Sequence, residues 1–170
     1  MRTPSDPSEY YFREFYEPLH RYFYFRLSDR FAVDDLVQTT FLKFIKHSQK
    51  ETSHEHLVRL LYTIARTTLI DYFRQRHKFA YSDIETVPDH LAAADTTPEY
   101  DAQRGEIIDE VHAALSHLSE TERDIVTMRM AEVEYATIAH VHNLSESNAR
   151  KIYSRACQKL QSLIPSYETP

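Results

Sequence analysis

Apolar residues recur at three- and four-residue steps along much of the chain, and this spacing predicts amphipathic helices. The clearest stripe predicts a helix that follows a polar loop at 48–53 and ends near 78: Leu57, Leu60, Leu61, Ile64, Ala65, Thr68, Leu69, Tyr72 and Phe73. A second stripe predicts a helix over 31–47, with Val33, Leu36, Val37, Phe41, Phe44 and Ile45 facing inward. The segment 10–27 is crowded with aromatic residues, and Pro18 should start or kink a helix there. Together these segments predict an N-terminal helical bundle.

A second set of helices is predicted after residue 97, where capping signals mark the helix starts. Thr97 followed by Pro98 suits an N-cap and a first helical position, for a helix that ends near 117. Ser119 with Glu122 three residues later is a capping-box pattern for a helix that ends near 130. The chain then predicts a short helix over 135–142, a turn at 143–145, and a helix from Ser145 as cap to about 164.

The segment between the two sets has a different character. Residues 79–97 lose the helical period, and residues 79–111 carry nine acids against one arginine. We therefore predict an all-α protein of two small helical bundles joined by a flexible acidic linker. The predicted boundaries are an N-terminal domain at 1–78, a linker at 79–103, and a C-terminal domain at 104–170 that contains a helix-turn-helix.

Composition narrows the class of protein. Glycine occurs once and tryptophan is absent, which favours helices over a sheet protein with glycine-rich turns. The single Cys157 excludes an internal disulfide and suits a reducing compartment. The N-terminus shows no apolar signal region, and no apolar run approaches the ~18 residues of a membrane span. We expect a cytoplasmic protein with no membrane span.

The distribution of charge changes what the net charge of −6 implies. A negative chain should avoid nucleic acid, but the acids concentrate around the linker. Residues 56–78 carry a net charge of +4, and so do residues 147–164. Two basic patches on either side of an acidic belt fit a two-point contact with DNA. Basic helix faces that are merely solvated would leave the same pattern.

The last two predicted helices have the form of a helix-turn-helix. Ile138, Ala139, Val141, Leu144, Ala149, Ile152, Tyr153 and Ala156 supply its inner faces. This leaves Ser147, Asn148, Arg150, Lys151 and Arg155 outward, at positions that enter the major groove in this motif. Arginine can pair with guanine, asparagine with adenine, and both cations with phosphates. An ordinary helical hairpin has a similar pattern.

Three stretches, in this order, resemble the extracytoplasmic-function group of sigma-70 family factors. Residues 34–46 read Asp-Asp-Leu-Val-Gln-Thr-Thr-Phe-Leu-Lys-Phe-Ile-Lys, and 61–66 read Leu-Tyr-Thr-Ile-Ala-Arg, within a span 10–78 that is similar to region 2. Residues 118–160, from Leu-Ser-Glu-Thr-Glu-Arg to Lys-Leu, are similar to region 4. The resemblance implies a promoter-specificity subunit that binds core bacterial RNA polymerase, recognises −10 and −35 elements and helps to melt the promoter. It implies no catalytic residue, cofactor or metal.

The resemblance also implies roles for particular residues. Docking on the clamp helices of the largest polymerase subunit would use Asp34, Asp35, Leu36, Gln38, Phe41 and Leu42. The −10 element would be bound by His54, Tyr62, Arg66, Thr67, Arg74, Arg76 and Lys78. The −35 element would be bound by Arg123, Ser147, Asn148, Arg150, Lys151 and Arg155. The polymerase flap is a further expected contact, and an anti-sigma factor is a further candidate partner.

The chain departs from the family pattern at several positions. Thr39 stands where an acid is frequent, Leu60 where tryptophan is common, Thr67 where asparagine is common, and Cys157 where arginine is common. Ser-Asn-Ala-Arg at 147–150 replaces Gly-Thr-Val-Lys, and Val-Glu-Tyr at 133–135 replaces Gly-Leu-Ser. The changes at 133–135, 147–150 and Cys157 bear on the preferred −35 sequence rather than on the fold, and Thr39 bears on one polar contact with the polymerase.

Two other classes of protein share parts of this pattern. A stand-alone helix-turn-helix regulator with an N-terminal sensing bundle accounts for the C-terminal motif but not for the match at 34–46. A metal enzyme would need ligands among the scattered histidines: His47, His54, His56, His112, His117, His140 and His142. The spacing of a zinc protease motif, a phosphate-binding loop or a nucleophile elbow does not occur.

Overall fold

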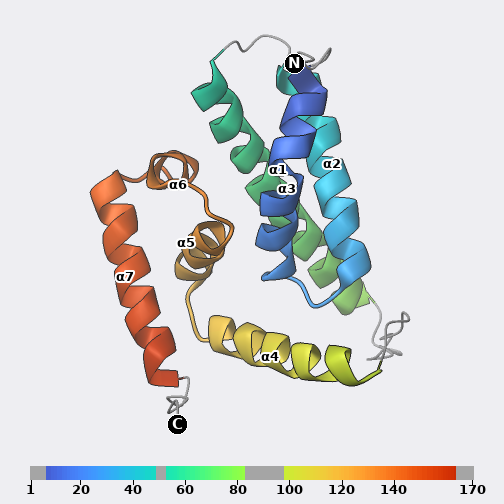
Figure 1. The fold of residues 1–170 in the computed structure, drawn as a ribbon, viewed down its shortest axis with the longest axis vertical. Helices are drawn as coiled ribbons and strands as arrows, with labels where there is room; N and C mark the ends of the chain where they lie inside the picture. Colours follow the sequence, from blue (N-terminus) through green and yellow to red (C-terminus); the bar gives the residue numbers. More distant parts are fainter. Residues whose placement is uncertain (1–6, 49–52, 83–97, 164–170) are drawn as a thin grey trace.

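The computed structural model describes residues 7–48, 53–82 and 98–163, and the side chains over 9–48, 53–78 and 107–163. Within these ranges the chain forms helices and no strand, which confirms the all-α prediction. The helices are α1 (Pro7–Tyr24), α2 (Arg30–Ser48), α3 (His54–Ser82), α4 (Pro98–Ser116), α5 (Glu120–Met130), α6 (Tyr135–His142) and α7 (Glu146–Leu163). Figure 1 shows α1–α3 as one bundle and α5–α7 beside it, with α4 crossing at one end.

Two helix boundaries differ from the predicted ones. Helix α3 continues to Ser82 because residues 78–81, Lys-Phe-Ala-Tyr, contain no proline or glycine to end it. Pro18 lies inside α1, which begins instead at Pro7. Helix α4 begins at Pro98, so described helices enter the predicted linker from both ends; residues 83–97, including the predicted Thr97 cap, lie outside the described residues.

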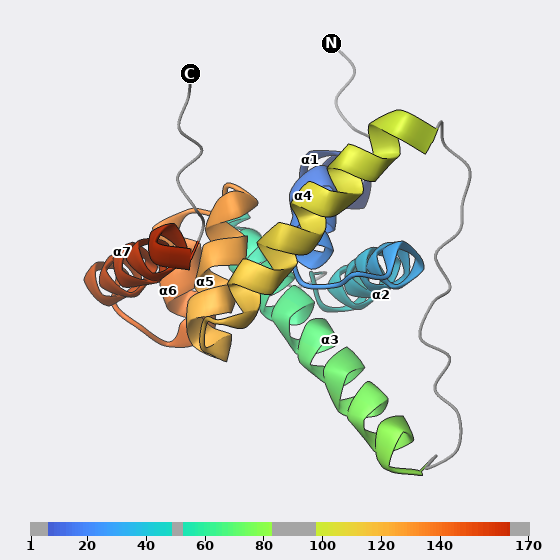
Figure 2. The ribbon, with the colours of Figure 1, turned by 90° about the horizontal axis from the view of Figure 1, so that it is seen from below.

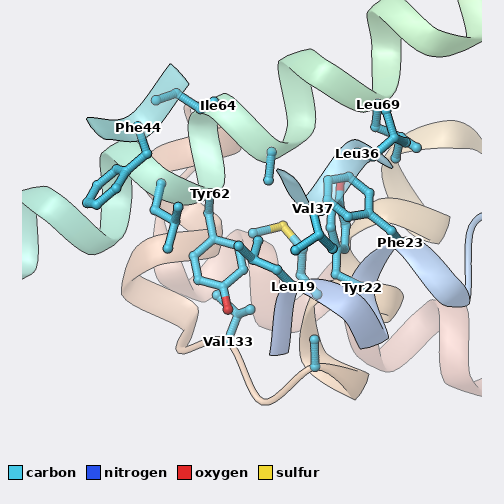
Figure 3. Packing of buried hydrophobic residues seen from close by; sticks show 14 of the residues in the cluster. Leu19, Tyr22, Phe23, Leu36, Val37, Phe44, Tyr62, Ile64, Leu69 and Val133 are labelled. Atoms are coloured by element: carbon cyan, nitrogen blue, oxygen red, sulfur yellow. The ribbon is translucent and has the colours of Figure 1, made fainter. Parts of the chain in front are cut away.

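The two bundles share one apolar core. In the N-terminal bundle, Leu19 and Phe23 of α1 pack with Val37 of α2 and Leu61 of α3. The same buried cluster continues into the C-terminal bundle through Ile125, Met128, Val133, Ile138 and Ala149. Figure 3 shows Val133 lying beside Tyr62 and Leu19. The two predicted bundles are therefore packed against each other, a contact that the sequence did not predict.

Helix α4 connects the two bundles at one end of the molecule. Leu115 is buried in a second, smaller cluster with Leu118, Val126 and Ala156, which joins α4 to α5 and α7. On its other side, the His112 ring places Nε2 3.0 Å from the carbonyl oxygen of Tyr24, at the end of α1. Figure 2 shows α4 passing across α1 toward α5.

The capping box predicted at the start of α5 is confirmed. The Glu122 amide donates to Ser119 Oγ at 3.4 Å, and the Ser119 amide donates to Glu122 Oε2 at 3.0 Å. Lys159 of α7 also donates to Glu122 Oε1 at 2.5 Å. These hydrogen bonds, the one from Lys159 first, lower the pKa of Glu122 from 4.5 to about 2. One carboxylate thus caps α5 and attaches α7 to it.

Glu122→Gln is expected to destabilise the protein at neutral pH. This loss of stability should become smaller as the pH is lowered into the acid range. A lowered carboxyl pKa contributes stability above the unfolded pKa, and that contribution is lost as pH falls through the folded pKa. The difference in free energy of unfolding between wild type and variant should therefore narrow from pH 4.5 toward 2. Urea titrations across this range measure it, with Glu9→Gln, from an exposed pair with Arg13, as control. A difference that stays constant with pH would contradict this role.

Candidate functional site

Helix α2 presents one acidic and apolar face to solvent. Asp34, Asp35 and Gln38 are exposed, and they continue into Leu42, which is 62% exposed, and Ile45, which is 40% exposed. Steps of three and four residues place them on one side of the helix. We call these five residues the α2 face. Ile45 had been predicted to point inward, and its exposure corrects that prediction.

Two residues of the predicted polymerase-docking set do not belong to this face. Leu36 and Phe41 are 5% and 4% exposed and lie in the shared core. They fall on the same helical stripe as Val37 and Phe44, which packs against α1 and α3. The predicted docking residues lie on both sides of α2, but only the exposed side can touch a partner. Leu36 and Phe41 therefore support the α2 face from behind.

The exposed side of α3 carries most of the predicted −10 residues. Thr67, Arg74, Arg76 and Lys78 are exposed. The Arg76 guanidinium lies over the Tyr72 ring, 5.8 Å from its centroid, and donates to the Tyr72 hydroxyl at 3.1 Å. These side chains give the last turns of α3 a positive surface.

In this packed arrangement Tyr62, a member of the predicted −10 set, is not available to DNA. Its ring is 3% exposed, and burial raises the pKa of its hydroxyl. Tyr62 neighbours Leu61 on the helix, and the C-terminal bundle covers that side of α3, as its position beside Val133 shows (Figure 3). The ring could stack on a base only if the two bundles separated.

His54 stands at the start of α3 and is tied to α1. Its Nδ1 lies 3.0 Å from the Tyr11 hydroxyl, and the two rings stack with centroids 5.7 Å apart. The residue is exposed at the same time. The structure thus places His54 at the edge of the loop that the sequence indicated, with its ring position fixed by Tyr11.

Arg66 is engaged by a buried carboxylate of the other bundle. Its Nε donates to Asp124 Oδ2 at 2.9 Å, and the Asp124 side chain is only 5% exposed. The Tyr22 hydroxyl donates to Asp124 Oδ1 at 2.5 Å. His142 Nε2 lies 3.1 Å from Oδ2, and Arg26 Nη1 lies 3.5 Å from Oδ1. We call these five residues the Asp124 cluster; it joins α1, α3, α5 and α6.

The electrostatics of this cluster keep the carboxylate charged. Burial raises the pKa of Asp124, but the hydrogen bond from His142, the charge of Arg26 and the hydrogen bond from Tyr22 outweigh it, and the pKa lies below its ordinary value. Burial and the Asp124 charge raise the pKa of the Tyr22 hydroxyl. The Arg26 side chain, 1% exposed, also pairs with Glu120 at the start of α5. The bundles are thus joined by buried charge as well as by apolar packing.

Sequence reasoning missed the Asp124 cluster. A usable signal was present, since Asp124 stands directly before Ile125 and one turn before Met128, on the inner side of an amphipathic helix. A charged residue at such a position needs a buried partner. The identity of the partners was not readable, because they come from helices far away in the sequence.

The helix-turn-helix is formed by α6 and α7, as predicted. Asn143 adopts the left-handed conformation with φ 54°, and the Leu144 amide donates to the Ala139 carbonyl at 2.8 Å. Ser145 caps α7 by accepting from the Asn148 amide at 3.2 Å. Behind the motif lie Ile138, Ala139 and Ala149, all buried. The outward residues are exposed as expected: Ser147, Asn148, Arg150, Lys151 and Arg155.

Arg123, the remaining member of the predicted −35 set, binds backbone carbonyls at the end of α4. Its Nε donates to the Leu115 carbonyl at 2.8 Å, and its Nη2 donates to the carbonyls of Ser116 and Leu118 at 3.1 and 3.0 Å. Leu115 and Ser116 are the last residues of α4, and Leu118 lies just beyond it, where backbone carbonyls run short of helical partners. The guanidinium therefore caps the end of α4, and a contact with DNA stays a prediction.

Two further properties of the described part of the chain limit the functions it supports. No helix there is long and apolar enough to cross a membrane. Its histidine, cysteine and acidic side chains form no group of three that would hold a metal ion.

Comparison with known sequences links both bundles to one family. The model of sigma-70 region 2 matches residues 11–79, and that of sigma-70 region 4 matches residues 108–160. The ECF RNA polymerase sigma factor SigM of Bacillus subtilis is 25% identical over 146 residues, 85% of this chain and 87% of SigM. The RNA polymerase sigma factor YlaC of the same organism is 24% identical over 157 residues, 92% of this chain and 91% of YlaC.

Two solved structures share the fold. CnrH, in complex with the cytosolic domain of CnrY, superimposes with a TM-score of 0.67 at 18% identity, over 92% of this chain and 86% of CnrH. The sigma factor RpoE of Bartonella quintana, in complex with the anti-sigma factor NepR, gives a TM-score of 0.64 at 22% identity, over 91% and 96% of the two chains. The arrangement of both bundles is therefore found in other proteins.

Proposed function

The chain belongs to the extracytoplasmic-function group of the sigma-70 family, and from this premise we propose a division of labour among its surfaces. The protein is a sigma factor for transcription initiation, a promoter-specificity factor for RNA polymerase. Sigma factors are in general not enzymes, because the polymerase carries out the chemistry. The observation that supports the division of labour is the separate exposure of three faces, on α2, α3 and α7. We place this work in the cytoplasm, with the polymerase.

The α2 face is the proposed docking site for the clamp helices of the largest polymerase subunit. It combines an acidic edge, at Asp34 and Asp35, with the exposed apolar side chain of Leu42. Apolar area supplies affinity at an interface, and charge at its edge supplies orientation and a faster encounter. The N-terminal domain, 1–78, would thus hold the polymerase and the −10 element.

The basic end of α3 is the proposed −10 surface. Thr67, Arg74, Arg76 and Lys78 are exposed and can meet the backbone of a melted strand, while His54 lies at the opposite end of the same helix. Arg66 is bound to Asp124 in this arrangement. It would reach DNA only after the bundles separate, so we propose that polymerase binding parts them. Residues 79–103 would then act as the acidic tether between two promoter elements.

The outer face of α7 is the proposed −35 surface. Asn148, Arg150 and Lys151 stand in its first two turns, where a recognition helix meets base edges. The C-terminal domain, 104–170, would contact the polymerase flap while α7 lies in the major groove. An anti-sigma protein is the proposed partner of the packed form, because the sigma factor RpoE, which shares this fold, is in complex with the anti-sigma factor NepR.

Asp35→Arg combined with Leu42→Ala is expected to weaken binding to core RNA polymerase at least about tenfold, which corresponds to ~1.4 kcal/mol. The double change reverses one charge of the α2 face and removes its most exposed apolar contact. Titration of labelled core polymerase measures the affinity. Asp109→Arg, an exposed charge reversal on α4, is the matched control and should bind as wild type does. Unchanged affinity in a folded double variant would overturn the docking assignment.

A further inference from the structure

Tyr135 lies at the meeting point of two arginines. It is the first residue of α6, and the guanidinium carbon of Arg150 sits over its ring at 4.1 Å from the centroid. The corresponding carbon of Arg129 lies 4.6 Å from the same centroid. The Tyr153 ring meets Tyr135 edge-on, with centroids 6.1 Å apart and planes at 77°. The Tyr135 ring thus contacts one guanidinium from α5 and another from α7.

Arg150 is held at two points but remains open to solvent. Its Nη2 lies 3.6 Å from Glu146 Oε2, one turn earlier on α7, and its side chain is 58% exposed. An arginine side chain that is free to rotate loses conformational freedom when it binds, which weakens the contact it makes. A guanidinium already resting on a ring loses less. Arg150 is therefore prepared to bind an outside group.

Arg129 fixes the ring from the other helix. Its Nη1 donates to the Val133 carbonyl at 2.6 Å, within the loop that leads into α6. The Arg129 residue is half-buried. The loop, the Tyr135 ring and Arg129 therefore form one support, and the exposed Arg150 side chain rests on it.

We propose that Tyr135 is a positioning residue that directs Arg150 toward one base pair of the −35 element. The inference rests on the proposed function of α7. It adds Tyr135 to the residues that determine the preferred −35 sequence, because Tyr135 acts through Arg150. An exposed cation on an aromatic face contributes enough to change an equilibrium about two- to fivefold. Tyr135 therefore sets the discrimination at the base pair read by Arg150.

The test is a double-mutant cycle in the reconstituted holoenzyme. Tyr135→Leu, Arg150→Ala and their combination are measured for equilibrium binding to promoters that carry each base at each −35 position. Tyr135→Leu should reduce discrimination about two- to fivefold at one position, and should have no further effect when Arg150 is alanine. Tyr135→Phe keeps the ring and should retain discrimination. Equal losses with and without Arg150, or a uniform loss at all positions, would overturn the proposal.

A second measurement covers the case in which Tyr135→Leu disturbs the fold. The Arg150 Nε–H signal of the free protein should show a ring-current shift in wild type and in Tyr135→Phe. It should move to its ordinary position in Tyr135→Ala or Tyr135→Leu, and an unchanged signal in a folded variant would refute the contact. The outcomes also separate the two proposals. If the wild-type holoenzyme shows no preference among −35 sequences, the proposed function of α7 is overturned. If that preference is present but the losses caused by Tyr135→Leu and Arg150→Ala are additive, only the role of Tyr135 is overturned.

Discussion

Asp124→Ala is expected to lower the free energy of unfolding by about 3–5 kcal/mol, since removing one partner of a buried ion pair leaves the others uncompensated. Arg26, with a side chain 1% exposed, would lose a carboxylate that lies 3.5 Å from its Nη1. The Tyr22 hydroxyl and Arg66 would lose their acceptors as well. These groups come from α1, from the residues that follow it and from α3, so the change should weaken the contact between the bundles.

Urea unfolding at neutral pH measures this effect, and Glu132→Gln is the matched control. Glu132 pairs with Arg21 between the same two bundles, but the pair is exposed, so its loss should cost no more than about 1 kcal/mol. The effect of Asp124→Ala should also depend on pH. Because the folded pKa of Asp124 is lowered from 3.8, its stabilisation is present above that value and disappears as pH falls through the folded pKa. A loss no larger than that of Glu132→Gln would contradict the importance of the buried cluster.

Arg150→Ala combined with Lys151→Ala is expected to abolish most −35 recognition while leaving polymerase binding intact. A bidentate arginine contact is worth about 1–3 kcal/mol of base discrimination, roughly five- to 150-fold. Loss of a lysine–phosphate contact should reduce the salt dependence of promoter binding by about one ion. Polymerase affinity should be unaffected because α7 lies on the opposite side of the molecule from α2 (Figure 1).

Promoter binding and core binding are measured on the same variant. Gln158→Ala, an exposed change later on α7, serves as control and should alter neither. The division of labour would be refuted if the double variant lost core affinity, or if it selected promoters as well as wild type does.

Local signals explain what the sequence predicted well. The bounds of α6, the turn at 143–145 and the caps at Ser119 and Ser145 were all readable, because each depends on residues within four positions of one another. The same holds for the outward side of α7, which follows from helical periodicity alone. The exposed basic residues of α3 were readable for the same reason.

Contacts between distant segments explain what the sequence did not predict. Tyr62 is buried because the other bundle covers it, and Arg66 is engaged because Asp124 approaches from α5. Arg123 is engaged because the end of α4 lies beside it. A family resemblance identifies the stretch that carries a function, but packing decides which of its side chains remain available.

Reconstitution with core RNA polymerase tests the central claim most directly. The protein is co-purified with core polymerase, and run-off transcription is then measured from a library of upstream regions. The account predicts a stoichiometric complex that initiates at a subset of promoters, with transcripts lost when either the −10 or the −35 element is replaced. Failure to bind core polymerase, together with tight binding of the free protein to duplex DNA, would contradict it and indicate a stand-alone helix-turn-helix regulator.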